Sequence, residues 1–144
     1  MKISTKGRYA LRVMLDIAGQ DTSGVIPLKV IAGRQGITLK YLEQIVPALC
    51  RAGLLTGTRG AGGGYRLAVR PETCRVGDIL RAVEGELAPV ACLEETENIC
   101  PRRGECPSVR FWEGLYQVIS DYVDSITLSD LLRTVTSSPA NETE

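Results

Sequence analysis

The 144-residue sequence contains no histidine, and its aromatic residues are limited to five Tyr, one Trp and one Phe. Without histidine the chain lacks the commonest general base and every zinc site that uses an imidazole. Because it also lacks a cofactor-binding motif, we expect a protein that is not an enzyme. No apolar run reaches the roughly 18 residues of a membrane helix, and no signal-peptide pattern begins the sequence. Five cysteines, an odd number, do not suit a fully paired secreted protein, so we expect a cytoplasmic protein without a membrane partner.

The net charge is zero, but the charges are unevenly distributed along the chain. Residues 1–80 contain 12 Lys and Arg against 5 Asp and Glu, whereas residues 81–144 contain 5 Lys and Arg against 12 Asp and Glu. A basic half of this kind suits a polyanionic partner such as nucleic acid, although chance segregation of solvated charge would give the same pattern. With 44% hydrophobic residues, the chain can form a compact core.

The apolar spacing predicts three helices in the first part of the chain. The first begins near Lys6, where apolar residues start to recur at i, i+3, i+4 and i+7. Pro27 is placed to begin a second, short helix, which Gly36 ends. Thr38 is a suitable N-cap for a third helix, which Gly53 ends. Two helices joined by a tight turn in this way form a helix-turn-helix.

Two β-prone runs, residues 54–58 and 65–69, flank a glycine-rich loop and predict a hairpin after the helix-turn-helix. We therefore predict a mostly α-helical fold with a small β-hairpin wing (α+β), followed by a long helix from Pro107 to Ile126. The expected parts are a winged helix-turn-helix DNA-binding domain over residues 1–84, a cysteine-bearing sensor loop over 85–107, a dimerisation helix and last turn over 108–133, and a disordered tail over 134–144.

The third predicted helix carries small polar and amide side chains near its start, as a helix that reads base edges in the major groove does. An ordinary solvated helix face has the same residue types, but the position after a turn helix favours recognition. In the hairpin loop, glycines let the backbone approach DNA, and Arg59 suits a narrow minor groove; a flexible turn with surface arginines is the alternative. The candidate DNA-binding residues are Lys6, Thr38, Lys40, Tyr41, Glu43, Gln44, Arg59, Gly60 and Arg66.

Three of the five cysteines, Cys92, Cys100 and Cys106, lie in the irregular segment with the spacing Cys-x7-Cys-x5-Cys. Soft thiolates from one loop can bind the irons of an iron–sulfur cluster, of the 2Fe–2S or the 4Fe–4S type, with a fourth ligand that the pattern does not identify. The spacing differs from the paired CxxC of a zinc ribbon, so a structural zinc fits less well. Thiols that respond to oxidation without any bound metal would show the same pattern.

The long predicted helix has a wider apolar stripe than packing on one domain requires, because Phe111 and Val118 extend it. Four of the chain's aromatic residues lie in this helix, and aromatic enrichment is typical of an oligomer interface. We therefore expect a homodimer. The candidate interface residues are Trp112, Leu115, Tyr116, Ile119, Tyr122, Val123 and Ile126.

Three segments together resemble the Rrf2 family of bacterial winged-helix regulators: MKISTKGRYA at residues 1–10, YLEQ at residues 41–44 and RGAGGGY at residues 59–65. The resemblance extends to about residue 133. It implies a homodimeric transcription regulator, usually a repressor, that binds a double-stranded DNA operator. Branches such as IscR, NsrR and RirA place three cysteines before the dimerisation helix, and Cys92, Cys100 and Cys106 occupy those positions.

The same resemblance implies that an iron–sulfur cluster controls operator affinity in response to iron, redox or nitric oxide status. The alternative follows from the cysteine-metabolism branch, CymR: a cluster-free regulator that responds to thiol oxidation or to a partner enzyme. The chain departs from the family at the fourth ligand. Val109 stands where the cluster-biogenesis branch has a histidine, and Arg8 stands where the nitric-oxide branch uses an aspartate of the partner subunit.

Overall fold

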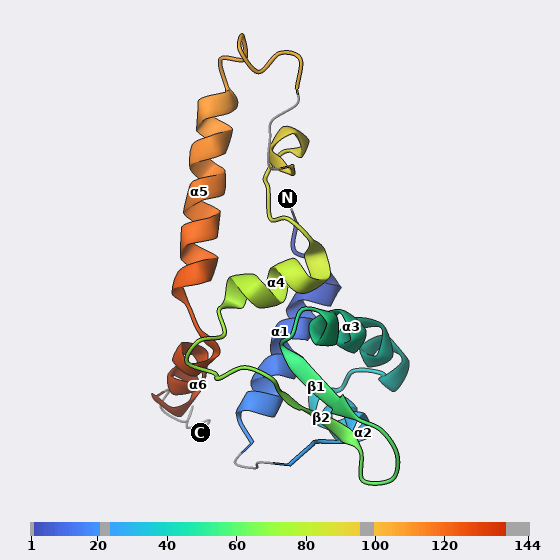
Figure 1. Ribbon diagram of the computed structural model, residues 1–144. Coiled ribbons are helices and arrows are strands. Elements are labelled where there is room, and N and C mark those ends of the chain that lie inside the picture. The colour runs from blue at the N-terminus through green and yellow to red at the C-terminus, as the bar shows by residue number, and fades with distance from the viewer. Residues whose placement is uncertain (1, 21–23, 96–99, 138–144) are drawn as a thin grey trace, which may run out of the picture.

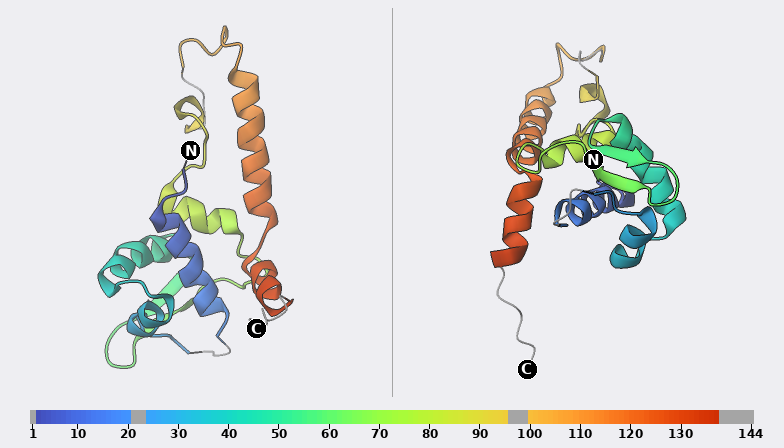
Figure 2. Two further views of the ribbon diagram at one scale, coloured as in Figure 1. Left: turned by 180° about the vertical axis from the view of Figure 1, so that it is seen from behind. Right: turned by 60° about the horizontal axis from the view of Figure 1, so that its bottom comes forward.

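The computed structural model describes residues 2–20, 24–95 and 100–137. In chain order its elements are α1 (Thr5–Ala18), α2 (Leu28–Gln35), α3 (Leu39–Arg51), β1 (Leu55–Thr58), β2 (Gly64–Leu67), α4 (Val76–Glu84), the short 3-10 helix η1 (Ala91–Leu93), α5 (Val109–Ser125) and α6 (Leu128–Ser137). Helices α1–α4 and the hairpin form a compact part, and α5 rises beside it (Figure 1, Figure 2). The predicted mostly α-helical winged fold is confirmed. Within the described ranges, none of the helices is both long and apolar enough to cross a membrane.

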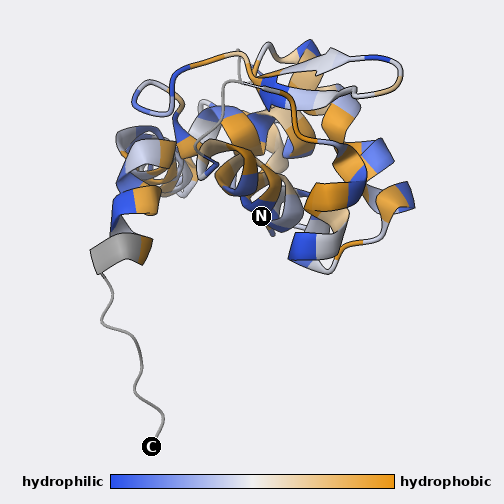
Figure 3. Cartoon of the chain, turned by 90° about the horizontal axis from the view of Figure 1, so that it is seen from below, coloured by the Kyte–Doolittle hydropathy of each residue, from blue (hydrophilic) through white to orange (hydrophobic). Residues whose placement is uncertain are grey.

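Helix α1 is the centre of the compact part, because its apolar face is surrounded by the other elements. Ala10, Val13 and Met14 are completely buried there, as the apolar spacing predicts. The helix contacts α2, α3, α4, α6 and β2. Seen from below, the apolar segments of these helices turn toward one another, while the hairpin loop is pale to blue (Figure 3). The other completely or almost completely buried large side chains of this core include Ile31, Leu42, Ile45, Leu49, Ile79 and Leu128.

The helix-turn-helix is formed by local signals in the sequence. Gly36 ends α2 in the left-handed conformation, at φ 63°, and its N–H donates to the carbonyl of Ala32. Glycine takes this conformation without a Cβ penalty. Thr38 then caps α3, because its side-chain oxygen accepts a hydrogen bond from the Tyr41 N–H at 3.2 Å. Pro27 is the N-cap of α2 rather than its first residue, so that helix begins one residue later than predicted.

The hairpin is attached to the segment that precedes α2. β1 and β2 pair in antiparallel register, with Leu55 opposite Leu67, and both strands are shorter than predicted. Ile26 and Tyr65 exchange two backbone hydrogen bonds of 2.8 Å each. A Cβ at Gly64 would lie 2.3 Å from the Ile26 carbonyl oxygen, so only glycine permits this approach. The wing is therefore held to the body by a backbone bridge.

The C-terminal helices differ from the prediction in their boundaries. α5 begins at Val109 with Ser108 as N-cap, two residues after the predicted start at Pro107. The predicted last turn is a ten-residue helix, α6, which continues to Ser137 and packs against α1. Residues 134–137 are therefore helical rather than part of the predicted disordered tail, and residues 138–144 lie outside the described residues.

The start of α6 is closed by a reciprocal cap. Thr127 and Asp130 form a capping pair, in which each backbone N–H donates to the other residue's side chain, at 3.0 and 3.1 Å.

Candidate nucleic-acid interface

The polar start of α3 is exposed because the opposite face of the helix is buried. Leu42, Ile45 and Leu49 anchor that face in the core. The predicted side chains that remain outside are Thr38, Lys40, Glu43 and Gln44, all of which are exposed. Amide, hydroxyl and charged groups at a helix start are suited to hydrogen bonds with base edges. The first two turns of α3 therefore present a polar surface to solvent that is suited to such bonds.

Tyr41 has a second role, because its ring packs against α1. The ring edge meets the ring of Tyr9 with centroids 5.4 Å apart and planes at 80°, a favourable aromatic geometry. The guanidinium of Arg12 lies 5.2 Å from the Tyr9 ring centroid. Of the predicted DNA-binding residues on α3, Tyr41 is therefore half-buried rather than fully exposed. Its ring connects α3 to the start of α1.

An ion pair joins α1 to the end of α2. Asp16 of α1 is only 8% exposed, and its carboxylate accepts two hydrogen bonds from the Arg34 guanidinium, at 2.6 and 3.1 Å. The amide of Gln35 donates a third hydrogen bond at 2.8 Å. These contacts attach the end of α2 to α1 immediately before the turn into α3. The sequence analysis missed this residue, because an acidic residue beside the apolar stripe of a helix is not in itself a signal of burial.

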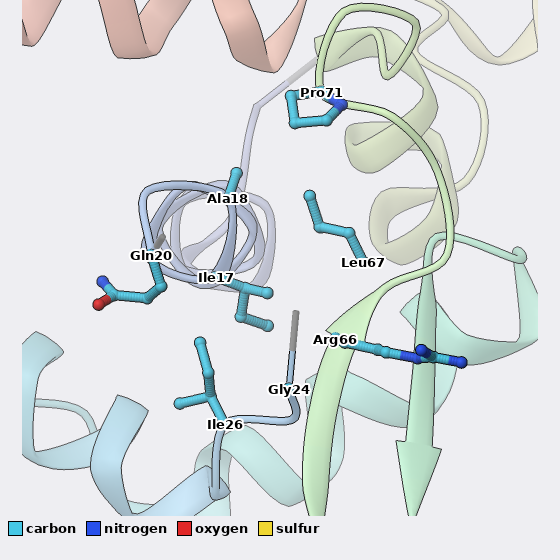
Figure 4. A pocket seen from close by; sticks show the side chains of 8 residues that line it. All are labelled: Ile17, Ala18, Gln20, Gly24, Ile26, Arg66, Leu67 and Pro71. Carbon is cyan, nitrogen blue, oxygen red and sulfur yellow. The ribbon is translucent and has the colours of Figure 1, made fainter. Parts of the chain in front are cut away.

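The wing presents its arginines away from the body of the protein. Arg59 and Gly60 are exposed in the loop, where Gly60 has a φ of 92° and accepts a backbone hydrogen bond from Gly63 at 2.9 Å. Arg66 extends over the neighbouring strand and away from a cavity of about 300 Å³ between the end of α1 and β2 (Figure 4). Among the described residues, neither Arg59 nor Arg66 has an ion-pair partner. Both cations are therefore available to a polyanion.

The three loop cysteines are near one another in sequence but are not gathered into a metal site. Cys92 lies in η1, Cys100 begins the turns that lead toward α5, and Cys106 precedes the α5 N-cap by two residues. Each is half-buried. In the part of the chain that the structure describes, no three His, Cys, Asp or Glu side chains are arranged to hold a metal ion.

The thiols differ in acidity for reasons of hydrogen bonding and burial. The hydroxyl of Ser108 lies 3.4 Å from the Cys106 sulfur, and the Ser108 side chain and backbone lower the pKa of that thiol. Burial raises the pKa of Cys74 to about 11, and it also raises the pKa of Cys50. Cys106 is therefore the more reactive type of thiol, and Cys74 behaves as a small core residue.

We expect alkylation to separate these two classes in the native, metal-free protein. At pH 7 a thiol with a pKa of about 11 is ionised in only about one molecule in ten thousand, and the thiolate is the nucleophile. With a limiting amount of iodoacetamide, peptide mass spectrometry should find Cys106 modified first and Cys74 last. The order should disappear in denaturant. Native Cys74 that reacts as fast as Cys106 would contradict the assignment of Cys74 to the core.

One face of helix α5 packs against α4, and another face is exposed to solvent. None of its side chains is buried, and Phe111, Val118 and Tyr122 are 64%, 65% and 66% exposed. Of the seven predicted interface residues, only Tyr122 is exposed, and the other six are half-buried. Two of these contact α4 or the segment after it: Tyr116 donates to Glu86 at 2.5 Å, and Val123 lies beside Gly77. The open apolar face therefore centres on Phe111, Val118 and Tyr122 rather than on the whole predicted set.

Known proteins share both the sequence and the fold. A model of the family described as Rrf2, iron-dependent transcriptional regulator, matches residues 3–134. The protein Rrf2 of Nitratidesulfovibrio vulgaris is 40% identical over 141 residues, which cover 98% of this chain and 93% of that protein. The crystal structure of CymR, the global cysteine regulator of B. subtilis, has a TM-score of 0.76 at 39% identity, over 93% of this chain and 98% of the other. The structure of T. potens IscR has a TM-score of 0.75 at 36% identity, over 98% and 94%.

Proposed function

The chain belongs to the Rrf2 family of transcriptional regulators, and from that premise we propose that it is a homodimeric DNA-binding regulator. In this proposal the protein acts as a repressor in the cytoplasm, and its cysteine loop sets its affinity for the operator. The observation that carries the DNA-binding part is the exposed polar start of α3 beside wing arginines that lack an ion-pair partner among the described residues. The Asp16–Arg34 pair supports it, because it attaches α2, the first helix of the motif, to α1.

Each predicted DNA-binding residue has a role in this proposal. Thr38, Lys40, Tyr41, Glu43 and Gln44 lie at the start of α3 and would enter the major groove, where base edges are read. Arg59 and Gly60 at the wing tip would approach the minor groove, since the glycines of this loop carry no side chain. Lys6 and Arg66 would contact phosphates and so fix the register on the duplex.

The homodimer would form through the open face of α5. A two-fold axis along this helix would place the two copies of α3 on half-sites about one helical turn apart, or a multiple of it. The support for this interface is the apolar stripe of Phe111, Val118 and Tyr122, which is larger than a surface helix needs.

The loop cysteines suit an iron–sulfur cluster by their chemistry, although the described conformation does not bring them together. Cys92, Cys100 and Cys106 provide three soft donors, and hydrogen bonding to Ser108 favours the thiolate of Cys106. Arg102 contributes a positive charge near Cys106. When bound, such a cluster would supply sensitivity to iron, oxygen or nitric oxide. The chain's own part would be to hold the three sulfurs between α4 and α5, with a fourth ligand from another group.

The second candidate is a cluster-free regulator of the same family, which responds through thiol oxidation or a partner enzyme. It is consistent with two observations: the three thiols are not gathered in the described conformation, and Cys106 has a lowered pKa. The similarity to CymR, a regulator described by its role in cysteine control, is also consistent with this candidate. Colour separates the two candidates, because anaerobically prepared protein should absorb visible light only if it binds a cluster.

Replacing Arg59 by alanine is expected to weaken operator binding by about 1–3 kcal/mol, because the wing would lose its contact with a base edge or a narrow groove. Fluorescence anisotropy with a labelled operator duplex measures the change. Arg110→Ala, which removes an equally exposed arginine at the start of α5, is the matched control and should leave the affinity unchanged. Equal titrations for wild type and Arg59→Ala would remove Arg59 from the interface.

A further inference from the structure

The carboxylate of Glu84 closes the first turn of α1 from a distant part of the sequence. Glu84 is the last residue of α4, and its Oε1 accepts hydrogen bonds from the Ser4 N–H at 2.9 Å, the Ser4 hydroxyl at 2.5 Å and the Gly7 N–H at 2.9 Å. The first N–H groups of a helix have no partner within the helix, and their positive end favours an anion. Glu84 therefore caps α1, together with Ser4.

The close approach depends on Gly7. This glycine is buried, and a Cβ in its place would lie 2.7 Å from Glu84 Oε1 and 2.8 Å from the Ile3 side chain. Any side chain at this position would therefore push the carboxylate away from the helix start. The contact is specific, because the Ser4 and Gly7 donors face one carboxylate oxygen of Glu84 and the missing Cβ of Gly7 leaves the space for it.

This end of α1 belongs to the proposed DNA surface. Lys6 and Arg8 are exposed in its first turn, and Tyr9 in the next turn packs against Tyr41 of α3. The positions of these cations relative to the reading helix therefore depend on how the start of α1 is held. Sequence reasoning could not find Glu84, since its partners are about 80 residues away in the chain.

The same helix, α4, is also attached to α5. Arg81 forms a bidentate ion pair with Asp124, at 2.7 and 3.1 Å, and Glu86 accepts from the hydroxyl of Tyr116. Hydrogen bonding to Arg81 lowers the pKa of Asp124, so this carboxylate stays ionised at neutral pH. Glu84 therefore holds the start of α1, while Arg81 and Glu86, three residues before it and two after it, hold the C-terminal end and the middle of α5.

We propose that Glu84 is a positioning residue for DNA binding, which fixes the start of α1 so that Lys6 and Arg8 meet backbone phosphates and which connects that end of α1 to α5. The inference rests on the proposed function. For the removal of Glu84, it predicts a change in DNA affinity opposite in sign to the change that charge repulsion alone would give. A carboxylate near DNA repels phosphates, so its removal would strengthen binding if charge alone mattered, whereas loss of positioning weakens it.

The test compares Glu84→Ala with Glu84→Gln on a duplex selected from a randomised pool by binding to the wild-type protein. Affinities are measured over a series of salt concentrations. Glu84→Ala should bind about 5- to 20-fold more weakly, and the slope of log affinity against log salt should fall by about one for each phosphate contact that is lost. Glu84→Gln should stay near wild type, because its amide oxygen accepts the same hydrogen bonds. Ser4→Ala, which removes one of the three donors, should show a smaller loss.

The matched control is Asp130→Ala, which removes another helix-capping carboxylate, at the start of α6 and outside the proposed DNA surface. It should lower the melting temperature comparably and leave the affinity and the salt slope unchanged. Glu84→Ala and Ser4→Ala that bind as tightly as wild type, or more tightly, would overturn the inference, as would an equal loss in Asp130→Ala. A wild-type protein that selects no duplex would overturn the proposed function itself.

Discussion

Replacing Val118 by glutamate is expected to convert the protein from a dimer into a monomer. Val118 lies on the open face of α5 between Phe111 and Tyr122 and is 65% exposed in the single chain. A two-fold interface would bury both introduced charges without partners, at a cost of several kcal/mol, on the order of a hundredfold or more in the dimer dissociation constant. Sedimentation velocity over a range of concentrations measures the change. Operator affinity should fall with it, because a monomer contacts one half-site.

Gln117→Glu is the matched control for this variant. Gln117 is the neighbouring residue on α5, is exposed, and donates to Asp121 at 2.7 Å, so the new charge stays in water beside another carboxylate. Its cost should be a few tenths of a kcal/mol, and the dimer should persist. If Val118→Glu still sedimented as a dimer, the face of Phe111, Val118 and Tyr122 would not be the interface.

Serine at any one of Cys92, Cys100 or Cys106 is expected to abolish or destabilise the visible chromophore of anaerobically reconstituted protein. Each position provides one of the three proposed soft donors, and a serine hydroxyl is a poor ligand for these irons. Absorption spectra together with iron and sulfide analysis measure the loss. Operator affinity should change by about 5- to 150-fold between the loaded and the empty protein, the usual size of coupling between two sites.

The remaining two cysteines provide the control. Cys74 is buried in the core and Cys50 is packed against it, so serine at either position should leave the chromophore intact. Equal chromophores in all five single variants, or none in the parent protein, would favour the cluster-free regulator. In that case oxidation of Cys106, rather than cluster loss, would be the event to follow.

The helices of the reading domain could be predicted because their signals are local. The burial of Ala10, Val13 and Met14 follows from spacing alone, and Thr38 acts as the cap that its position suggests. The wing follows from two β-prone runs around glycines. The runs do not give its exact ends, which lie at Leu55–Thr58 and Gly64–Leu67. Secondary structure in this chain is thus specified by residues close together in sequence.

The contacts that hold the elements together could not be predicted in the same way. The burial of Asp16 in α1 depends on its hydrogen bonds with Arg34 and Gln35 of α2. These two helices meet only in the folded chain. The length of α6 depends on packing against α1, because the Thr- and Ser-rich sequence after Thr134 gives no helical signal. Whether three thiols in one loop come together is likewise a tertiary property, which spacing does not specify.

The junction between α5 and α6 acts as a fulcrum. Val76 N–H donates to the Ile126 carbonyl and Leu128 N–H to the Cys74 carbonyl, both at 2.9 Å, so the lower end of α5 is attached to the start of α4 by backbone hydrogen bonds. The 17 residues of α5 extend about 25 Å from this point, and a tilt of about 5° would move the far end by about 2 Å. In such a tilt the cysteine end of the helix would move farthest, while its base stays attached to the start of α4. In the proposed dimer, a change in the loop would then alter the angle between the two protomers.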